Sequence, residues 1–120
     1  MEQNISKQEE PKDLDEVAVQ NLVNKWLTSW KSGDMESYRS VYASDFKSKG
    51  RNLDDWISYK TSVHQKSKDI AISIDKLHIS ERNNDATAVF TQNYSSSIFK
   101  DSGNKTLKLK KINNEWKIVE

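Results

Sequence analysis

The spacing of apolar residues changes near the middle of this chain, and that change limits its possible folds more than any other feature. In the first half, apolar residues recur every three or four positions, as in Val19, Val23, Trp26 and Trp30, which is the spacing of one helix face. In the second half, from Ile70 onward, they alternate with polar residues, as in a half-buried strand. Helices followed by strands predict an α+β fold in which the helices cover one face of the sheet.

Each of the three predicted helices has a residue suited to begin or end it. The first helix should begin near Asp13 or Asp15 and end before Gly33, because aspartate caps helix starts and glycine follows helix ends. Asp34 should cap a short second helix, and Asn52 should cap the third. The residues between these two helices, 47–52, are interpreted as a basic loop.

The second half of the chain is expected to form four strands in an antiparallel meander. The alternation changes phase between Ile74 and Leu77, which predicts a β-bulge, since a bulge shifts the pattern by one residue. A bulged sheet bends, so helices lying across it should leave a conical core with a pocket at its mouth. Turns are expected at three places, rich in Asn, Asp and Gly: residues 82–85, 101–104 and 113–114.

Composition excludes several classes of function. The chain has no cysteine and two separated histidines, so we expect no disulfide, no metal site and no cofactor. Its net charge is +1, which does not favour nucleic acid as a partner. We expect no membrane-spanning segment and no signal peptide, because a charged stretch follows Met1 and no apolar run is long enough. Residues 1–13 are interpreted as a disordered leader or linker, and residues 14–120 as the domain.

An aromatic ladder in the first half resembles a known family. Trp26, Trp30, Asp34, Tyr38, Tyr42 and Phe46 follow one another at intervals of four, and the chain closes on the Trp-Lys-Ile-Val of residues 116–119. With the strand pattern between them, these motifs resemble the NTF2-like superfamily (SnoaL-like, cystatin-like folds). They are most similar to the accessory NTF2-like domain found beside L,D-transpeptidase (YkuD-type) catalytic domains and in some bacterial repeat proteins. The resemblance covers residues 20–119.

The resemblance implies a fold, a role and a location. The fold would be a cone of three N-terminal helices packed on a curved four-stranded antiparallel sheet. The role would be binding, positioning or dimerisation beside an enzyme that trims or cross-links peptidoglycan, outside the cytoplasm. The family pattern has arginine where this chain has Lys60, and lysine keeps the charge but loses the planar fork of guanidinium.

The strand of residues 86–94 contains the most informative site candidates. Gln92 and Tyr94 share its inner face with Phe90, and buried polar groups need partners. If Lys100 pairs with Lys105 across the turn, Lys111 lies opposite Tyr94. The complete set of predicted pocket residues is Tyr42, Trp56, Lys60, Phe90, Gln92, Tyr94 and Lys111.

Two functions are consistent with these residues. The favoured one is a non-catalytic domain that binds a peptide or glycan fragment of the cell wall, or forms a homodimer through the outward sheet face of Val89, Thr91, Lys108 and Lys110. The alternative is a small-molecule isomerase or dehydratase that uses the same pocket. That chemistry needs an acid/base pair inside the cone, and neither His64 nor His78 is expected there.

Overall fold

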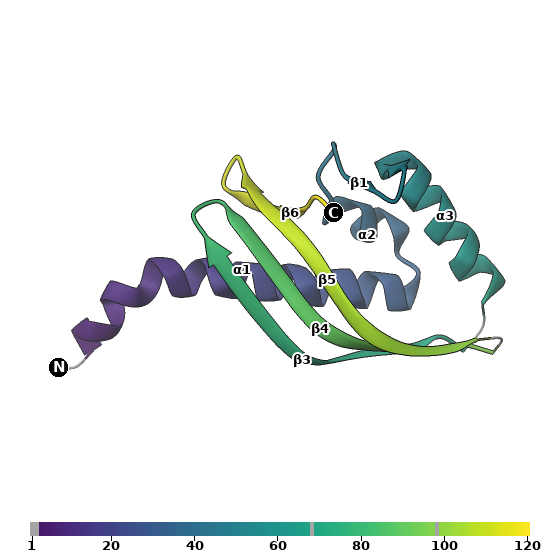
Figure 1. Ribbon diagram of the computed structural model, residues 1–120, viewed down its shortest axis with the longest axis horizontal. Helices are drawn as coiled ribbons and strands as arrows, with labels where there is room; N and C mark the ends of the chain where they lie inside the picture. Colours follow the sequence, from purple (N-terminus) through teal and green to yellow (C-terminus); the bar gives the residue numbers. More distant parts are fainter. Residues whose placement is uncertain (1–2, 68, 98) are drawn as a thin grey trace.

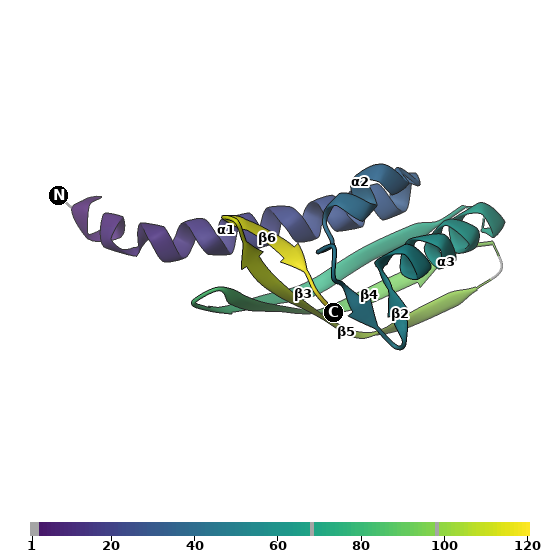
Figure 2. The ribbon, with the colours of Figure 1, turned by 90° about the horizontal axis from the view of Figure 1, so that it is seen from above.

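The computed structural model describes residues 3–67, 69–97 and 99–120, with side chains described from Leu14 onward. The helices α1, α2 and α3 lie on one face of a four-stranded antiparallel sheet, whose strand order is β3-β4-β5-β6 (Figures 1 and 2). The predicted α+β fold with this sheet is confirmed. The elements are α1 (Gln3–Ser32), α2 (Met35–Ser40), β1 (Lys47–Ser48), β2 (Arg51–Asn52), α3 (Leu53–Lys66), β3 (Ala71–Arg82), β4 (Asp85–Ser95), β5 (Lys100–Ile112) and β6 (Glu115–Ile118).

The predicted caps at the α1–α2 junction are confirmed. Gly33 has φ +83°, a conformation that glycine adopts without steric penalty. The backbone N–H groups of Gly33 and Asp34 both donate to the carbonyl of Ser29, each at 3.0 Å. The Asp34 side chain then accepts a hydrogen bond from the N–H of Ser37 and begins α2. This tight turn folds α2 back along α1.

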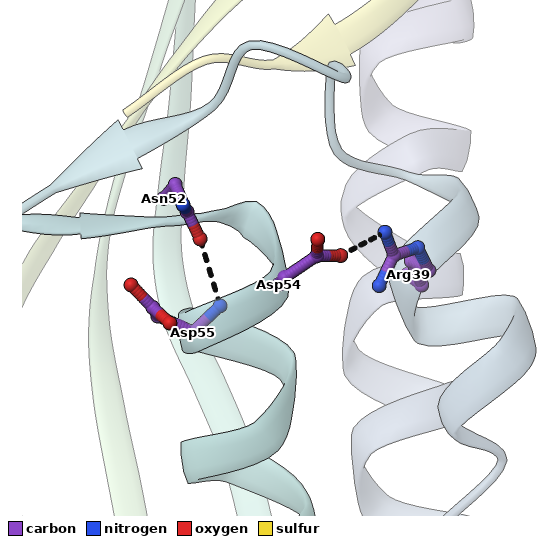
Figure 3. Close-up of polar contacts among 4 residues, drawn as sticks. All are labelled: Arg39, Asn52, Asp54 and Asp55. Atoms are coloured by element: carbon purple, nitrogen blue, oxygen red, sulfur yellow. Dashed lines mark hydrogen bonds and ion pairs between the residues drawn. The ribbon is translucent and has the colours of Figure 1, made fainter.

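The start of α3 is held by its cap and by one ion pair, both shown in Figure 3. The side chain of Asn52 accepts a 2.9 Å hydrogen bond from the N–H of Asp55, so this predicted cap is confirmed. Arg39 of α2 pairs with Asp54 in the first turn of α3. The pair is exposed, so we expect it to orient α3 more than to stabilise the fold.

Two predictions for the first half of the chain differ from the structure, namely the start of α1 and the loop of residues 47–52. Helix α1 begins at Gln3 rather than at Asp13 or Asp15, since glutamate, glutamine and lysine in this stretch favour helix. The division into leader and domain stays a prediction. Residues 47–52 form the small hairpin β1–β2 rather than a loop, because Lys49 and Gly50 adopt the positive φ values of a tight turn.

The turns of the sheet are partly as predicted. A register shift between Asp75 and His78 confirms the bulge, and Lys76 within it has φ +59°. Asn113 and Asn114, with φ values of +52° and +67°, confirm the β5–β6 turn. The turn predicted at residues 101–104 is wrong, because these residues lie within β5 and pair with β4.

The core fills the space between the sheet and the helices. Helix α1 contacts β3, β4 and β6. The small residues Ala86 and Ala88 on the inner face of β4 leave room for the large side chains of α1. The predicted inner and outer faces of β4 are correct, since Phe90 is buried and Val89 is exposed. No helix in the described part of the chain is both long enough and apolar enough to cross a membrane.

Replacing Gly33 by alanine should destabilise the protein more than replacing Gly50 by alanine. Both glycines have a φ near +80°, so each change carries a backbone penalty of about 1–2 kcal/mol. A Cβ on Gly33 would also meet the His64 ring at 2.6 Å, whereas one on Gly50 would meet nothing within 4 Å. Urea unfolding measures the free energy of unfolding of both variants, and the difference between them is the steric cost of the contact with His64. Equal decreases in stability would show that His64 moves aside without penalty.

Candidate functional site

The inner face of the sheet changes from apolar to polar along its length, and this change creates a cavity. On β5, the buried residues Leu109 and Leu107 are followed on the same face by Lys105, Gly103 and Asp101. Gly103 faces Gln92 across the strands, and a Cβ added to it would have no neighbour within 4 Å. The core therefore stops at this level and leaves a hollow beneath the helices.

This cavity has a volume of about 370 Å³ and is closed by residues of α1, α2, α3, β4 and β5. A larger and shallower depression of about 730 Å³ lies at the end of β3 and β4. It wraps around the sheet end, because its lining takes residues from both sheet faces, so we regard the smaller cavity as the candidate site. That cavity is lined by Trp26, Trp30, Tyr38, Tyr59, Lys60, Val63, Ser67, Gln92, Tyr94, Phe99 and Asp101.

Lys60 of α3 brings a positive charge to the cavity. Its ammonium lies 4.8 Å from the ring centre of Trp30, 5.0 Å from that of Trp56 and 6.0 Å from that of Tyr59. Burial, with smaller effects from the nearby ammonium groups of Lys105 and Lys49, lowers the pKa of Lys60 to about 8. Within the described residues, no carboxylate lies in ion-pair distance of Lys60. It is a cation held by aromatic faces.

Tyr42 and Trp56 support the cavity instead of lining it. The hydroxyl oxygen of Tyr42 accepts hydrogen bonds from the indole Nε1 of Trp26 at 3.0 Å and of Trp56 at 3.1 Å. Tyr42 in turn donates to the Tyr38 hydroxyl at 2.9 Å. Burial raises the pKa of Tyr42. This network fixes the two indole rings, and Trp56 is one of the rings that face Lys60.

The three predicted residues of β4 have different surroundings. Phe90 is 1% exposed and packs against Trp26, so it belongs to the core beneath the cavity. Gln92 and Tyr94 line the cavity, as expected. The Gln92 amide has no hydrogen-bond partner among the described side chains and backbone groups, so it is free to bind solvent or a ligand.

The prediction that Lys111 lies opposite Tyr94 is wrong. Tyr94 pairs with Asp101, and Lys111 lies at the far end of β5, paired with Trp116. There its ammonium contacts Asp15 of α1 at 3.0 Å, which lowers the pKa of the Asp15 carboxyl. The cause is the misplaced turn at residues 101–104, which shifted the β4–β5 register. Lys111 fastens α1 to the sheet and has no part in the cavity.

Several cavity residues were not among the predicted ones. Tyr38 belongs to the aromatic ladder, whose helical spacing is consistent with a core stripe as well as with a pocket wall. Asp101 would have been found with the correct register. It is the one carboxylate in the described lining, and it is exposed. His64 packs on Trp30 and His78 is exposed, so neither histidine is in the described lining. No described group of His, Asp or Glu is arranged for a metal ion.

Comparison with family models identifies the domain. The model of the Cds6 C-terminal NTF2-like domain matches residues 18–120. The chain belongs to this family. No curated protein matches it. Many solved structures share the fold of this domain. In some of them the matching domain is one part of a larger protein.

Two of these larger proteins are bacterial. Bd1075 of Bdellovibrio bacteriovorus is 28% identical, with a TM-score of 0.79 over 84% of this chain and 37% of Bd1075. Pgp2 of Campylobacter jejuni, described as a helical cell shape determining protein, is 21% identical, with a TM-score of 0.71 over 82% of this chain and 37% of Pgp2. The chain thus spans little more than a third of each.

An NTF2-like protein of Streptomyces avermitilis, described as a proposed dehydratase, is 14% identical, with a TM-score of 0.77 over 90% and 93% of the two chains.

Proposed function

We propose that this domain binds an anionic, peptide-like fragment of the bacterial cell wall in the 370 Å³ cavity and performs no chemistry on it. The observation that carries the proposal is Lys60, a cation in the cavity wall that lacks a carboxylate partner among the described residues. A half-buried charge without a partner is unfavourable, so a carboxylate of the ligand would complete the site.

The rest of the cavity is consistent with a peptide that carries carboxylates. Lys105 and Lys49 lie close enough to Lys60 to disfavour its charge, and the Arg51 guanidinium stacks on Tyr59 at 4.1 Å. This positive surrounding attracts anions. The Gln92 amide can bind a peptide group, and the rings of Tyr59 and Tyr94 offer apolar surface to the aliphatic parts of the peptide.

The proposal of a cell-wall ligand is supported by the similarity to Pgp2. Pgp2 determines helical cell shape, and a bacterium's shape is set by its wall. The resemblance to accessory domains of L,D-transpeptidases suggests the same setting, so we propose that the domain works beside a peptidoglycan-modifying enzyme in the periplasm. Pairing of two copies through the outward sheet face, which includes the exposed Val89, is part of this proposal.

The alternative function is a dehydratase or isomerase that uses the same cavity, as proposed for the Streptomyces avermitilis protein. Lys60, with its pKa of about 8, and Asp101 are the groups that could move a proton. Asp101 is exposed at the mouth, where water competes with a substrate. The histidine–carboxylate pair that would favour catalysis is missing from the described lining, so we place this function second.

Calorimetric titration with the synthetic tripeptide L-alanyl-γ-D-glutamyl-meso-diaminopimelate tests the proposal. Wild-type protein should bind it, and Gln92→Leu and Tyr94→Phe should each weaken binding about 5- to 10-fold, the value of a lost hydrogen bond. Both should keep the wild-type circular dichroism spectrum. Thr91→Val is the matched control, because Thr91 lies on the same strand but bonds Asn104 on the outward face.

The possible outcomes distinguish the site, the proposed function and the alternative. Unchanged affinity in both cavity variants would move the site elsewhere, and a wild type that does not bind would reject the proposal. Mass spectrometry of the peptide after incubation addresses the alternative. A product of new mass, as from dehydration, or one of the same mass with a new chromatographic retention time, as from isomerisation, would support an enzyme, whereas unchanged peptide supports a binding domain.

A further inference from the structure

The hydrogen-bond network behind the cavity has a fixed direction. An indole N–H can only donate, so the Tyr42 oxygen must accept from both Trp26 and Trp56. These two bonds occupy its lone pairs. The remaining contact of Tyr42, 2.9 Å to the Tyr38 oxygen, must therefore use the Tyr42 proton, and Tyr38 is the acceptor.

Because Tyr38 accepts this bond, its own proton is left without an acceptor among the described residues. Tyr38 is 1% exposed, and no described group accepts a hydrogen bond from its hydroxyl. Burial holds the pKa of Tyr38 well above its ordinary value, so the hydroxyl remains protonated. A buried donor without an acceptor is unfavourable, and Tyr38 borders the cavity. The one hydroxyl of this network that lacks a described acceptor thus belongs to a residue of the cavity lining.

Tyr38 and Lys60 lie against the same ring. The Tyr38 ring centre is 5.5 Å from that of Trp30, and the Lys60 ammonium is 4.8 Å from it. The ring that carries the Tyr38 hydroxyl and the ammonium of Lys60 therefore both lie against Trp30, one from α2 and the other from α3. A carboxylate has two oxygens, which suits two donors set apart in this way.

We propose that Tyr38 donates its hydroxyl proton to a carboxylate oxygen of the bound peptide, and that Tyr38 and Lys60 together select a carboxylate over a neutral amide. This inference rests on the proposed function and adds a specificity-determining residue to it. The two tryptophans and Tyr42 then act as positioning residues, since they fix the direction in which Tyr38 donates.

The test compares wild type with Tyr38→Phe, which keeps the ring and removes the donor. Titration uses the tripeptide named above and the same peptide with its carboxyl groups amidated. Tyr38→Phe should weaken binding of the carboxylate peptide about 10-fold or more, because a hydrogen bond to a charged group is the stronger kind. Binding of the amidated peptide should weaken less, so the preference for carboxylate should shrink.

Two further variants keep the test decisive. Ser37→Ala on the same helix removes a bond to Asp34 away from the cavity, and should leave both affinities unchanged. If Tyr38→Phe does not fold, 3-fluorotyrosine placed at position 38 keeps the hydroxyl and makes it a stronger donor, so it should tighten carboxylate binding. An equal loss for both peptides in Tyr38→Phe, or no tightening with fluorotyrosine, would overturn the inference alone. A wild type that binds neither peptide would overturn the proposed function as well.

Discussion

Replacing Trp30 by alanine should lower the free energy of unfolding by about 3–5 kcal/mol, the usual range for removing a buried aromatic side chain. Trp30 is 4% exposed and joins three elements, because its ring packs on Tyr38 of α2 and on His64 and Lys60 of α3. Urea unfolding followed by circular dichroism measures the loss.

Tyr59→Ala is the matched control for this change. Tyr59 is also an aromatic residue beside Lys60, but 42% of it is exposed. Its removal should lower the unfolding free energy by about 1 kcal/mol or less, as for most surface changes. A Trp30→Ala variant no less stable than Tyr59→Ala would show that Trp30 is not the junction of the three helices.

Lys60→Met should affect binding and stability in opposite directions. Methionine keeps the unbranched side chain and contacts aromatic rings well, but it removes the charge. Affinity for the cell-wall tripeptide should fall about 10- to 100-fold, the value of one charge-assisted hydrogen bond. Stability at pH 7 should rise, because the folded protein no longer buries an ammonium beside Lys105 and Lys49.

The stability gain of Lys60→Met should depend on pH in a defined way. The pKa of Lys60 is lowered from 10.5 to about 8 in the folded protein. Between these values the unfolded chain binds more protons than the folded one, so wild-type stability from this group rises with pH, by at most about 1.4 kcal/mol per unit. The gain should therefore be largest below pH 8 and vanish as pH approaches 10.5.

Thermal unfolding of both proteins between pH 6.5 and 10.5 measures this difference. Lys110→Met provides the control, because Lys110 is exposed on the outward sheet face and should show no such trend. A gain that does not change with pH would mean that the Lys60 ammonium is fully hydrated. A loss of stability at pH 7 would mean that its contacts with the rings outweigh its burial.

Local features of this fold could be predicted from the sequence because a few neighbouring residues determine them. The caps at Asp34 and Asn52, the glycine after α1 and the bulge before Leu77 each follow from one side chain or from a change of phase. The Asn113–Asn114 turn is of the same kind, since both residues adopt positive φ.

Features that depend on strand pairing could not be predicted in the same way. Gly103 and Asn104 look like a turn, yet β4 continues to Ser95 and supplies pairing partners that keep residues 101–104 in a strand. Because of this error, the predicted pocket contained Lys111 in the place that Asp101 occupies in the structure. The bond from Trp56 to Tyr42 joins residues on α3 and just beyond α2, and no spacing along the chain indicates it.

Nuclear magnetic resonance of the ¹⁵N-labelled domain, titrated with the tripeptide, tests the binding site most directly. The largest shifts should occur at the cavity, in the backbone amides of Lys60, Gln92 and Tyr94 and in the indole N–H of Trp56. Amides of the outward face, such as those of Thr91 and Lys108, should change little. Shifts that are largest on that outward face, or no shifts at millimolar peptide, would contradict a ligand held in the cone.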